Sequence, residues 1–206
     1  MTSVSQQPYR ELLARSVVWD VSAENARELA TQLKNPVRYV PLGYASVWSQ
    51  IPRSPVQDID VLFYGASHPR RLAILQRLAA EGLAVMAIVD VYSEERDALI
   101  ARAKVVIVIA YWLPARFDSV RINYLLANQK AVIRECNPGE ETSGDLMGGM
   151  VETPYESLVE NALELVEDEP RRRALEKAGL EHLAKRDQRA IMQAALADVG
   201  RAESMP

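Results

Sequence analysis

Apolar and polar positions follow two periods in the middle of the chain. Short continuous apolar runs such as 105–109 are separated by segments with the periodicity of amphipathic helices. The pattern predicts strands at 60–64, 84–90, 104–110 and 130–134, and helices at 68–81, 93–102 and 117–127. This order is typical of right-handed βαβ crossovers, so we predict an α/β fold with a Rossmann-like parallel sheet and helices on both faces.

Weaker patterns flank this unit. Before it we expect helices at 9–14 and 22–33, strands at 16–19 and 37–40, and a connector rich in proline and glycine at 41–57. After it, residues 137–149 contain four glycines and Pro138, which favours a mobile loop able to close over a ligand. Helices are expected at 154–167, 170–185 and 188–199, with Arg171, Arg172 and Arg173 on exposed faces. The predicted division is an N-terminal annex and connector at 1–57, a Rossmann-like domain with C-terminal helices at 58–200, and a tail at 201–206.

Charge and cysteine content narrow the class of ligand. The formal net charge is −4 over 206 residues, which argues against general nucleic-acid binding and favours a small phosphate-bearing ligand. Cys136 is the single cysteine, so no intrachain disulfide is expected, and no zinc-type spacing of cysteine and histidine occurs. Apolar runs fall short of the roughly 20 residues that cross a bilayer. We therefore expect a soluble, cytoplasmic protein with no transmembrane segment and no metal.

The exit of the first predicted central strand carries the main candidate site. The turn of residues 65–69 is followed at once by Arg70 and Arg71. Ser67 is expected to cap the next helix, whose backbone N–H groups attract anions together with the guanidinium groups. Gly65 and Ser67 then belong to a phosphate-binding turn, and His68 could bond a phosphate or transfer a proton. Arg70 and Arg71 are equally compatible with solvated residues of a first helical turn.

Exits of later strands supply further candidates. Tyr111 and Trp112 could stack on a base or a sugar ring, or serve as core aromatics. Glu135 closes the fourth central strand, where a carboxylate could hold ribose or sugar hydroxyls. Arg121 and Asn123 lie on the preceding helix.

Several segments resemble the GT-B glycosyltransferases of the "glycosyl transferases group 1" type, which include CgeB-like proteins. The matching phrases are residues 18–20, 40–44, 58–65, 69–71, 95–104 and 124–132. The resemblance implies a C-terminal, donor-binding Rossmann-like half that holds a nucleotide sugar as co-substrate, without a metal or other cofactor. It also implies a glycosyl transfer in which His68 and Glu135 are catalytic. The donor would be bound by Gly65, Ser67, Arg70, Arg71, Tyr111, Trp112, Arg121 and Asn123.

The resemblance covers that half and only the last strand–helix–strand of the first, acceptor-binding half. A homodimer or a partner would then complete the cleft. Relatives carry two glutamates where this chain has Arg116 and Tyr124, and His-Tyr-Tyr-Glu where it reads Ala110-Tyr111-Trp112-Leu113. Two alternatives to glycosyl transfer therefore stay open: a non-catalytic subunit of a partner glycosyltransferase, and an enzyme of altered chemistry on a phosphorylated or nucleoside-like small molecule.

Overall fold

The computed structural model describes residues 7–113, 117–137 and 144–203, with side chains as far as residue 198. The chain forms two compact units. The larger spans Tyr44–Lys185, and the smaller combines Met1–Gly43 with Arg186–Pro206. This division differs from the predicted boundary at 57/58. From Tyr44 onwards the connector belongs to the larger unit, where Asn128 Oδ1 accepts hydrogen bonds from the Gln50 and Ile51 amides, at 2.9 and 2.8 Å.

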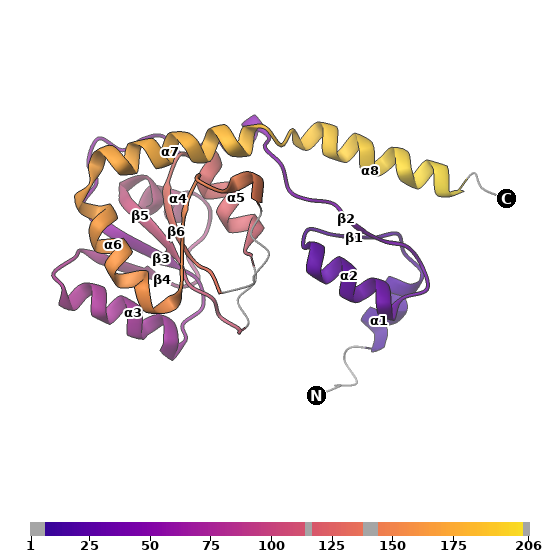
Figure 1. Cartoon of the computed structure of the whole chain (residues 1–206), viewed down its shortest axis with the longest axis horizontal. Coiled ribbons are helices and arrows are strands. Elements are labelled where there is room, and N and C mark those ends of the chain that lie inside the picture. The colour runs from indigo at the N-terminus through magenta and orange to yellow at the C-terminus, as the bar shows by residue number, and fades with distance from the viewer. Residues whose placement is uncertain (1–6, 114–116, 138–143, 204–206) are drawn as a thin grey trace. The chain divides into compact units, whose positions relative to one another are not determined.

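The larger unit is built around a five-stranded sheet in the order β4-β3-β5-β6-β7, and every neighbouring pair is parallel (Figure 1). The strands are β3 (Ile59–Tyr64), β4 (Val85–Ile88), β5 (Ala103–Val108), β6 (Ala131–Glu135) and β7 (Val151–Thr153). The first four confirm the predicted strands. We did not predict β7, because its three residues are too short to show a period.

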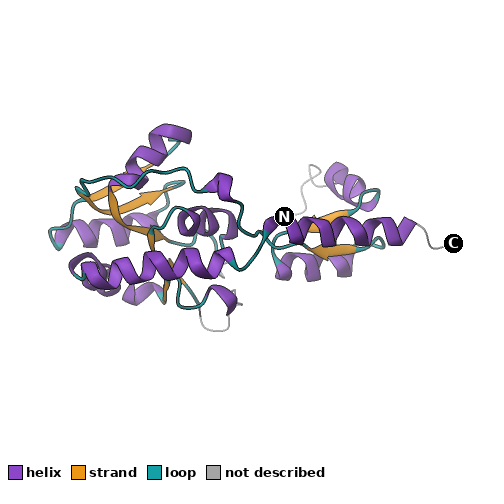
Figure 2. Ribbon diagram, turned by 90° about the horizontal axis from the view of Figure 1, so that it is seen from above, coloured by secondary structure: helices purple, strands orange, loops and turns teal. Residues whose placement is uncertain are grey.

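Helices cover both faces of this sheet, as Figure 2 shows. The helices are α3 (Pro69–Ala80), α4 (Ser93–Arg102), α5 (Ser119–Ala127), α6 (Leu158–Glu167) and α7 (Glu169–Ala184). Alternate strand residues point to opposite faces, so Val61 and Ile107 pack with α3 and α6, whereas Leu62 and Val106 pack with α5. The predicted Rossmann-like α/β class is confirmed, with short 3₁₀ turns η2 (Ser46–Trp48), η3 (Gly144–Leu146) and η4 (Tyr155–Ser157) in its connections.

The smaller unit contains a two-stranded parallel sheet. Its elements are α1 (Gln7–Ala14), β1 (Val18–Asp20), α2 (Ala23–Gln32), β2 (Val37–Tyr39) and α8 (Gln188–Glu203). Ser22 caps α2 by accepting a hydrogen bond from the Asn25 amide at 3.2 Å. An ion pair of 2.7 Å joins Arg38, on β2, to Asp198, on α8. The helix α8 therefore belongs with the N-terminal elements, whereas we had predicted it with the Rossmann-like domain.

Part of the predicted loop is anchored, and one surface prediction needs correction. Leu146 is fully buried, and Gly149 lies so near Gly179 of α7 that an added Cβ would be 2.9 Å from the Gly179 Cα. The other residues between 144 and 148 are exposed. The remainder of the predicted mobile loop, 138–143, lies outside the described residues. Arg172 is buried because its guanidinium donates to the carbonyls of Leu165 and Val166, at the C-terminal end of α6.

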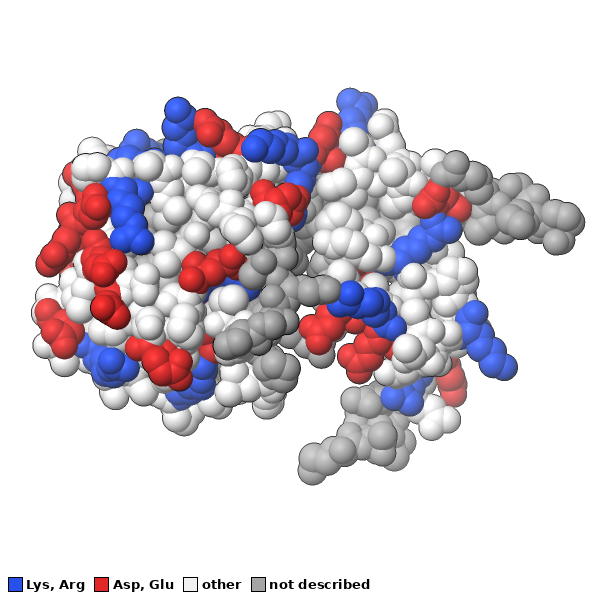
Figure 3. Space-filling view, in the orientation of Figure 1, with Lys and Arg blue, Asp and Glu red and all other residues white. Residues whose placement is uncertain are grey.

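Charged side chains of both signs are interspersed over the visible face of the larger unit (Figure 3). This agrees with the small net charge of the sequence. Across the described part of the chain, we find no helix with both the length and the apolar character needed to cross a membrane.

Lys130 is a charged residue that is buried, with only 4% of its surface exposed. Burial lowers the pKa of its ammonium group from 10.5 to about 8. The folded state therefore binds this proton less tightly than the unfolded state does. Below pH 8 Lys130 is protonated in both states, so the folded state bears the full free-energy cost of burying the charge. The free energy of unfolding rises as the pH goes from 8 towards 10.5.

We expect Lys130→Met to raise the free energy of unfolding at pH 7 by about 2 kcal/mol, which is the cost of the shift less one lost hydrogen bond. The gain should disappear above about pH 11, where the wild-type amine is largely neutral in both states. Urea denaturation at several pH values measures it. Lys177→Met, on an exposed face of α7, is the control, and a Lys130→Met protein less stable than wild type at pH 7 would contradict the expectation.

Candidate functional site

The strand order places a crevice between the carboxyl ends of β3 and β5. From β3 the chain moves to β4 on one side, and then crosses back to β5 on the other. At such a switch point the helices that follow the two strands lie on opposite faces, which leaves the strand ends uncovered. The order 2-1-3-4-5 is that of other doubly wound sheets that bind ligands there. The residues that leave β3 and β5 are therefore the first place to look for a site.

Gly65 brings two guanidinium groups together at the end of β3. Arg121 Nη1 donates to the Tyr64 carbonyl at 2.8 Å, and Arg71 Nη1 donates to the Ala66 carbonyl at 2.9 Å. A Cβ on Gly65 would lie 3.3 Å from Arg121 Nη2 and 3.6 Å from Arg71 Nη1. The Gly65 φ of +138° is also one that residues with a side chain rarely adopt. Both conformation and space therefore require glycine here.

Gly65→Ala is expected to lower the free energy of unfolding by about 1–3 kcal/mol, through backbone strain and displacement of the two arginines. Thermal or urea unfolding measures the loss. Gly82→Ala is a control for strain alone, because Gly82 has a φ of +91° and nothing within 4 Å of an added Cβ. Gly144→Ala has the same free space without the positive φ. A Gly65 variant no less stable than the Gly82 variant would show that the contact with the arginines is unimportant.

Arg70 and Glu135 form a two-pronged ion pair across the crevice, between the start of α3 and the end of β6. Arg70 Nη1 donates to Glu135 Oε2 at 2.6 Å, and Nη2 donates to Oε1. The same Oε2 accepts the Ala110 amide at 3.0 Å. Tyr155 stacks on the Arg70 guanidinium at 3.8 Å and donates its hydroxyl to the Arg70 carbonyl. Both oxygens of Glu135 are thus occupied, and its side chain is fully buried.

Of the three arginines at the crevice, Arg71 is the one whose charge is not paired with a carboxylate of the described residues. It is 7% exposed, and its other hydrogen bond runs from Nε to the Ile109 carbonyl at 3.0 Å. Within the described part of the chain it makes no ion pair, whereas Arg121 pairs with Asp118 at 3.2 Å. Burial, and then the nearby Arg121 charge, lower the pKa of the Arg71 guanidinium. A buried cation held only by carbonyls favours an anion beside it.

A cavity of about 470 Å³ adjoins this arginine. Among the described residues that line it are Arg71, Tyr111, Trp112, Asp118 and Glu135. The volume falls in the range of roughly 300–1,000 Å³ that is usual for small-molecule sites. The cavity follows the carboxyl ends of β5 and β6, and so extends the crevice at the switch point.

Aromatic rings lie beside the arginines. The His68 and Tyr111 ring centroids are 5.0 Å apart, and Trp112 lies edge-on to Tyr111 at 4.8 Å. The Arg71 guanidinium carbon is 5.0 Å from the Tyr111 centroid. Trp112 is 77% exposed, so one aromatic surface is open to a ligand. Tyr111 is half-buried and contacts both the buried Arg71 guanidinium and the exposed Trp112 ring.

The structure brings together most of the residues that we predicted for the site. Gly65, Arg70, Arg71, Tyr111, Trp112, Arg121 and Glu135 all border the switch point or its cavity, through the contacts above. Ser67 is exposed and does not cap α3 as predicted. The cap is His68, which accepts a hydrogen bond from the Arg70 amide through Nδ1 at 3.4 Å. Asn123 is fully buried on α5 and is not one of the described residues that line the cavity. Arg116 lies outside the described residues.

Sequence reasoning missed three residues that shape the site. Asp118 caps α5 and holds Arg121. Arg134 lines the cavity from inside β6 while donating to Glu152 at 2.7 Å. Tyr155 holds Arg70 from a segment that we predicted as helix only. A charged residue inside an apolar strand was the available signal for Arg134, and an acid three positions before Arg121 was the signal for Asp118.

Solved structures similar in fold to this chain include GT-B glycosyltransferases. HepE from Anabaena in complex with UDP-glucose has a TM-score of 0.68 and 14% identity, over 93% of this chain and 66% of HepE. Sucrose-phosphate synthase from Thermosynechococcus elongatus has a TM-score of 0.64 and 18% identity, over 99% of this chain and 65% of the synthase. TarM has a TM-score of 0.66 and 8% identity, over 92% and 45%.

These likenesses establish the fold, and the chain spans less than two thirds of the length of each of the three proteins. No protein-family model matches the sequence, and no curated protein matches it either. The expected resemblance to GT-B glycosyltransferases is thus confirmed at the level of the fold. The finer CgeB-like assignment stays a prediction.

Proposed function

We propose that this chain binds a nucleoside diphosphate sugar in the crevice between β3 and β5, and that it is the donor-binding part of a glycosyltransferase. The observation that carries the proposal is Arg71, a buried guanidinium without a carboxylate partner among the described residues, at the wall of a 470 Å³ cavity. A diphosphate supplies the missing negative charge in a form that suits a guanidinium fork. The bound UDP-glucose of HepE supports this ligand class.

Other parts of the site fit the rest of such a ligand. Tyr111 and Trp112 offer aromatic surface for the base or the sugar ring. Gly65 lets the Arg121 and Arg71 guanidinium groups lie close to the backbone at the end of β3, where both could reach a phosphate. Arg121 adds a second positive charge beside Arg71, which would stabilise a departing diphosphate. His68 is our candidate for proton transfer, because its ring centroid lies 5.0 Å from that of Tyr111, which lines the cavity.

Isothermal titration calorimetry with UDP-glucose, UDP, and the corresponding guanosine, adenosine and thymidine compounds tests the proposal. We expect saturable binding of at least one diphosphate, and weaker binding of the matching monophosphate, because the second phosphate carries the added charge. Failure of every compound in the panel to bind would overturn the proposal.

A non-catalytic nucleotide-sugar-binding subunit is the second candidate, and the state of Glu135 favours it. The two oxygens of this carboxylate already accept hydrogen bonds from Arg70 and the Ala110 amide, which leaves it poorly placed to accept a proton from a substrate. Mass spectrometry of products formed from a bound donor distinguishes the two candidates. Transfer or hydrolysis lost on His68→Ala would support the enzyme, and binding without turnover would support the subunit.

The acceptor half is proposed to come from a second copy of the chain or from a partner. Light scattering of the purified chain tests the first possibility, since a monomer at all concentrations would exclude the homodimer.

A further inference from the structure

A second cavity lies at the opposite end of β6 from Glu135. It measures about 150 Å³ and lies next to Lys130, the residue just before that strand. Its described lining includes Arg53 from the connector, and Arg173 and Glu176 from α7. This amino-edge pocket shares none of its described lining residues with the cavity at the carboxyl edge.

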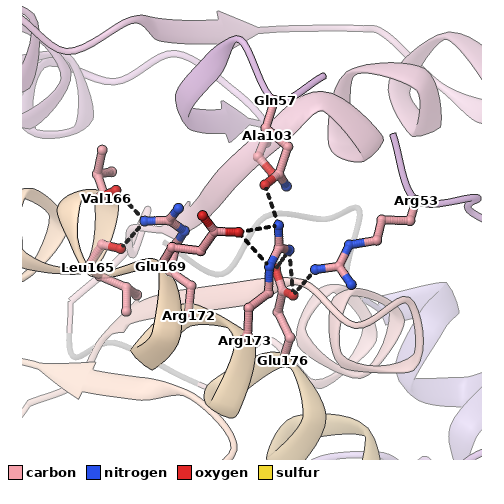
Figure 4. A network of polar contacts seen from close by, with 9 residues as sticks. All are labelled: Arg53, Gln57, Ala103, Leu165, Val166, Glu169, Arg172, Arg173 and Glu176. Atoms are coloured by element: carbon pink, nitrogen blue, oxygen red, sulfur yellow. Dashed lines mark hydrogen bonds and ion pairs between the residues drawn. The ribbon is translucent and has the colours of Figure 1, made fainter. Parts of the chain in front are cut away.

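The walls of the amino-edge pocket are held in place by hydrogen bonds. Arg173 donates to Glu176 at 2.9 Å and to the Gln57 side chain at 3.1 Å. Arg53 donates to the same Glu176 oxygen, Oε2, at 3.2 Å. Figure 4 shows the guanidinium groups of Arg53 and Arg173 converging on Glu176. Asn128 fixes the connector that carries Arg53, through the Gln50 and Ile51 amides.

Positive charge exceeds negative charge in this pocket. Among its described lining residues, Arg53, Lys130 and Arg173 are cationic and Glu176 is the one carboxylate. Glu169, which also pairs with Arg173 at 3.1 Å, has a side chain that is 62% exposed. Its charge is therefore screened by water more than that of Glu176, whose side chain is 7% exposed. The Arg53 side chain is 61% exposed and is screened in the same way. Lys130 and Arg173 against Glu176 then leave one cation in excess in the less exposed part of the cluster.

Lys130 is that cation. Its ammonium carries three N–H donors, yet the one acceptor within hydrogen-bond distance among the described residues is the Ala101 carbonyl at 3.3 Å. No carboxylate of the described chain lies within ion-pair distance of it. Burial is the main cause of the lowered pKa of Lys130; Glu176 raises this pKa, whereas Arg173 and Arg53 lower it further. Buried ammonium groups need acceptors for their remaining protons.

We propose that the amino-edge pocket binds a small oxyanion of the size of phosphate, held by the Lys130 ammonium and by Arg53 and Arg173. A cavity of about 150 Å³ has room for roughly six non-hydrogen atoms, the size of benzene, and so admits one phosphate. The oxygens supply the acceptors that Lys130 lacks. The anion is either free phosphate or the phosphoryl group of a larger molecule whose remainder lies outside the pocket.

Calorimetric titration of the full-length chain with inorganic phosphate tests the proposal. We expect saturable binding that weakens roughly tenfold or more in Lys130→Met, because a charge-assisted hydrogen bond is lost. Arg53→Met should also weaken it, and this variant keeps the test open if Lys130→Met does not fold. Lys177→Met, on an exposed face of α7, should bind as wild type does.

Arg71→Met separates the two cavities of this chain. If phosphate binds at the amino-edge pocket, this variant retains phosphate binding; loss of binding in Arg71→Met but not in Lys130→Met would assign the anion to the carboxyl edge and overturn the proposal. Absence of phosphate binding by wild type, together with absence of methyl phosphate binding, would also overturn it. Tighter binding of methyl phosphate than of phosphate would indicate a phosphoryl group of a larger molecule, and the reverse would indicate the free ion.

Acylation of Lys130 gives a second, independent readout. Acetic anhydride acetylates neutral amines, and Lys130 has a low pKa and lies at a cavity. The extent of its acetylation can therefore be compared with that of Lys177 by mass spectrometry. Bound phosphate should decrease the labelling of Lys130 and leave that of Lys177 unchanged. Equal labelling of Lys130 with and without saturating phosphate would contradict an anion beside its ammonium group.

Discussion

Replacing Arg70 by methionine is expected to lower the free energy of unfolding by about 3–5 kcal/mol, as removal of one partner from a buried ion pair does elsewhere. The reason is Glu135, whose side chain is fully buried and would keep only the Ala110 amide as a donor. The stacking of Tyr155 on the guanidinium is lost as well. Urea denaturation monitored by circular dichroism measures the change.

Two further variants show whether the uncompensated charge is the cause. Arg70→Met combined with Glu135→Gln removes that charge while an oxygen stays available to the Ala110 amide, so it should recover part of the stability. Arg102→Met breaks a pair of similar geometry with Asp58, at 2.8 and 2.6 Å, but on the surface. It should change stability little, because water replaces the lost partner. An Arg70 variant as stable as the Arg102 variant would contradict this account.

Arg71→Met is expected to weaken the binding of a nucleoside diphosphate sugar about a hundredfold or more, in line with about 2–5 kcal/mol for truncating one partner of a buried charge pair. The loss arises because this buried guanidinium lies at the cavity and makes no ion pair with a carboxylate of the described residues. Calorimetry with the best ligand of the nucleotide panel measures it.

The matched control for this variant is Arg77→Met, on the exposed side of the same helix, which should bind as wild type does. Arg71→Lys keeps a charge but loses the fork, so it should bind with intermediate affinity. Because Arg71 also bonds the Ile109 and Ala66 carbonyls, the melting temperature of each variant has to be measured beside its affinity. A folded Arg71→Met protein with unchanged affinity would exclude Arg71 from the site.

The sequence predicted most of the residues of the candidate site, but not the ion pairs and hydrogen bonds between them. A turn followed by Arg70 and Arg71 is visible in the sequence, and so is Glu135 at a strand end. Arg70 binds Glu135, whereas Arg71 has no carboxylate partner in the described chain. This difference depends on the direction in which each side chain leaves α3. Neighbouring residues of a helix point about 100° apart, and the sequence does not state which of the two faces the cavity.

Periodicity by itself determined the first four strands and the helices of the larger unit, because continuous apolar runs can only be buried between two layers of helices. Its sequence also specified glycine and two arginines at the end of β3. Only the tertiary structure decided the strand order, and with it the switch point, because that order depends on which strands pair across long stretches of chain. The same long-range packing placed α8 with the N-terminal elements, buried Arg172 against the end of α6, and set Lys130 beside a cavity. Charges that look alike in sequence thus differ in burial, since burial is fixed by neighbours that the local pattern does not contain.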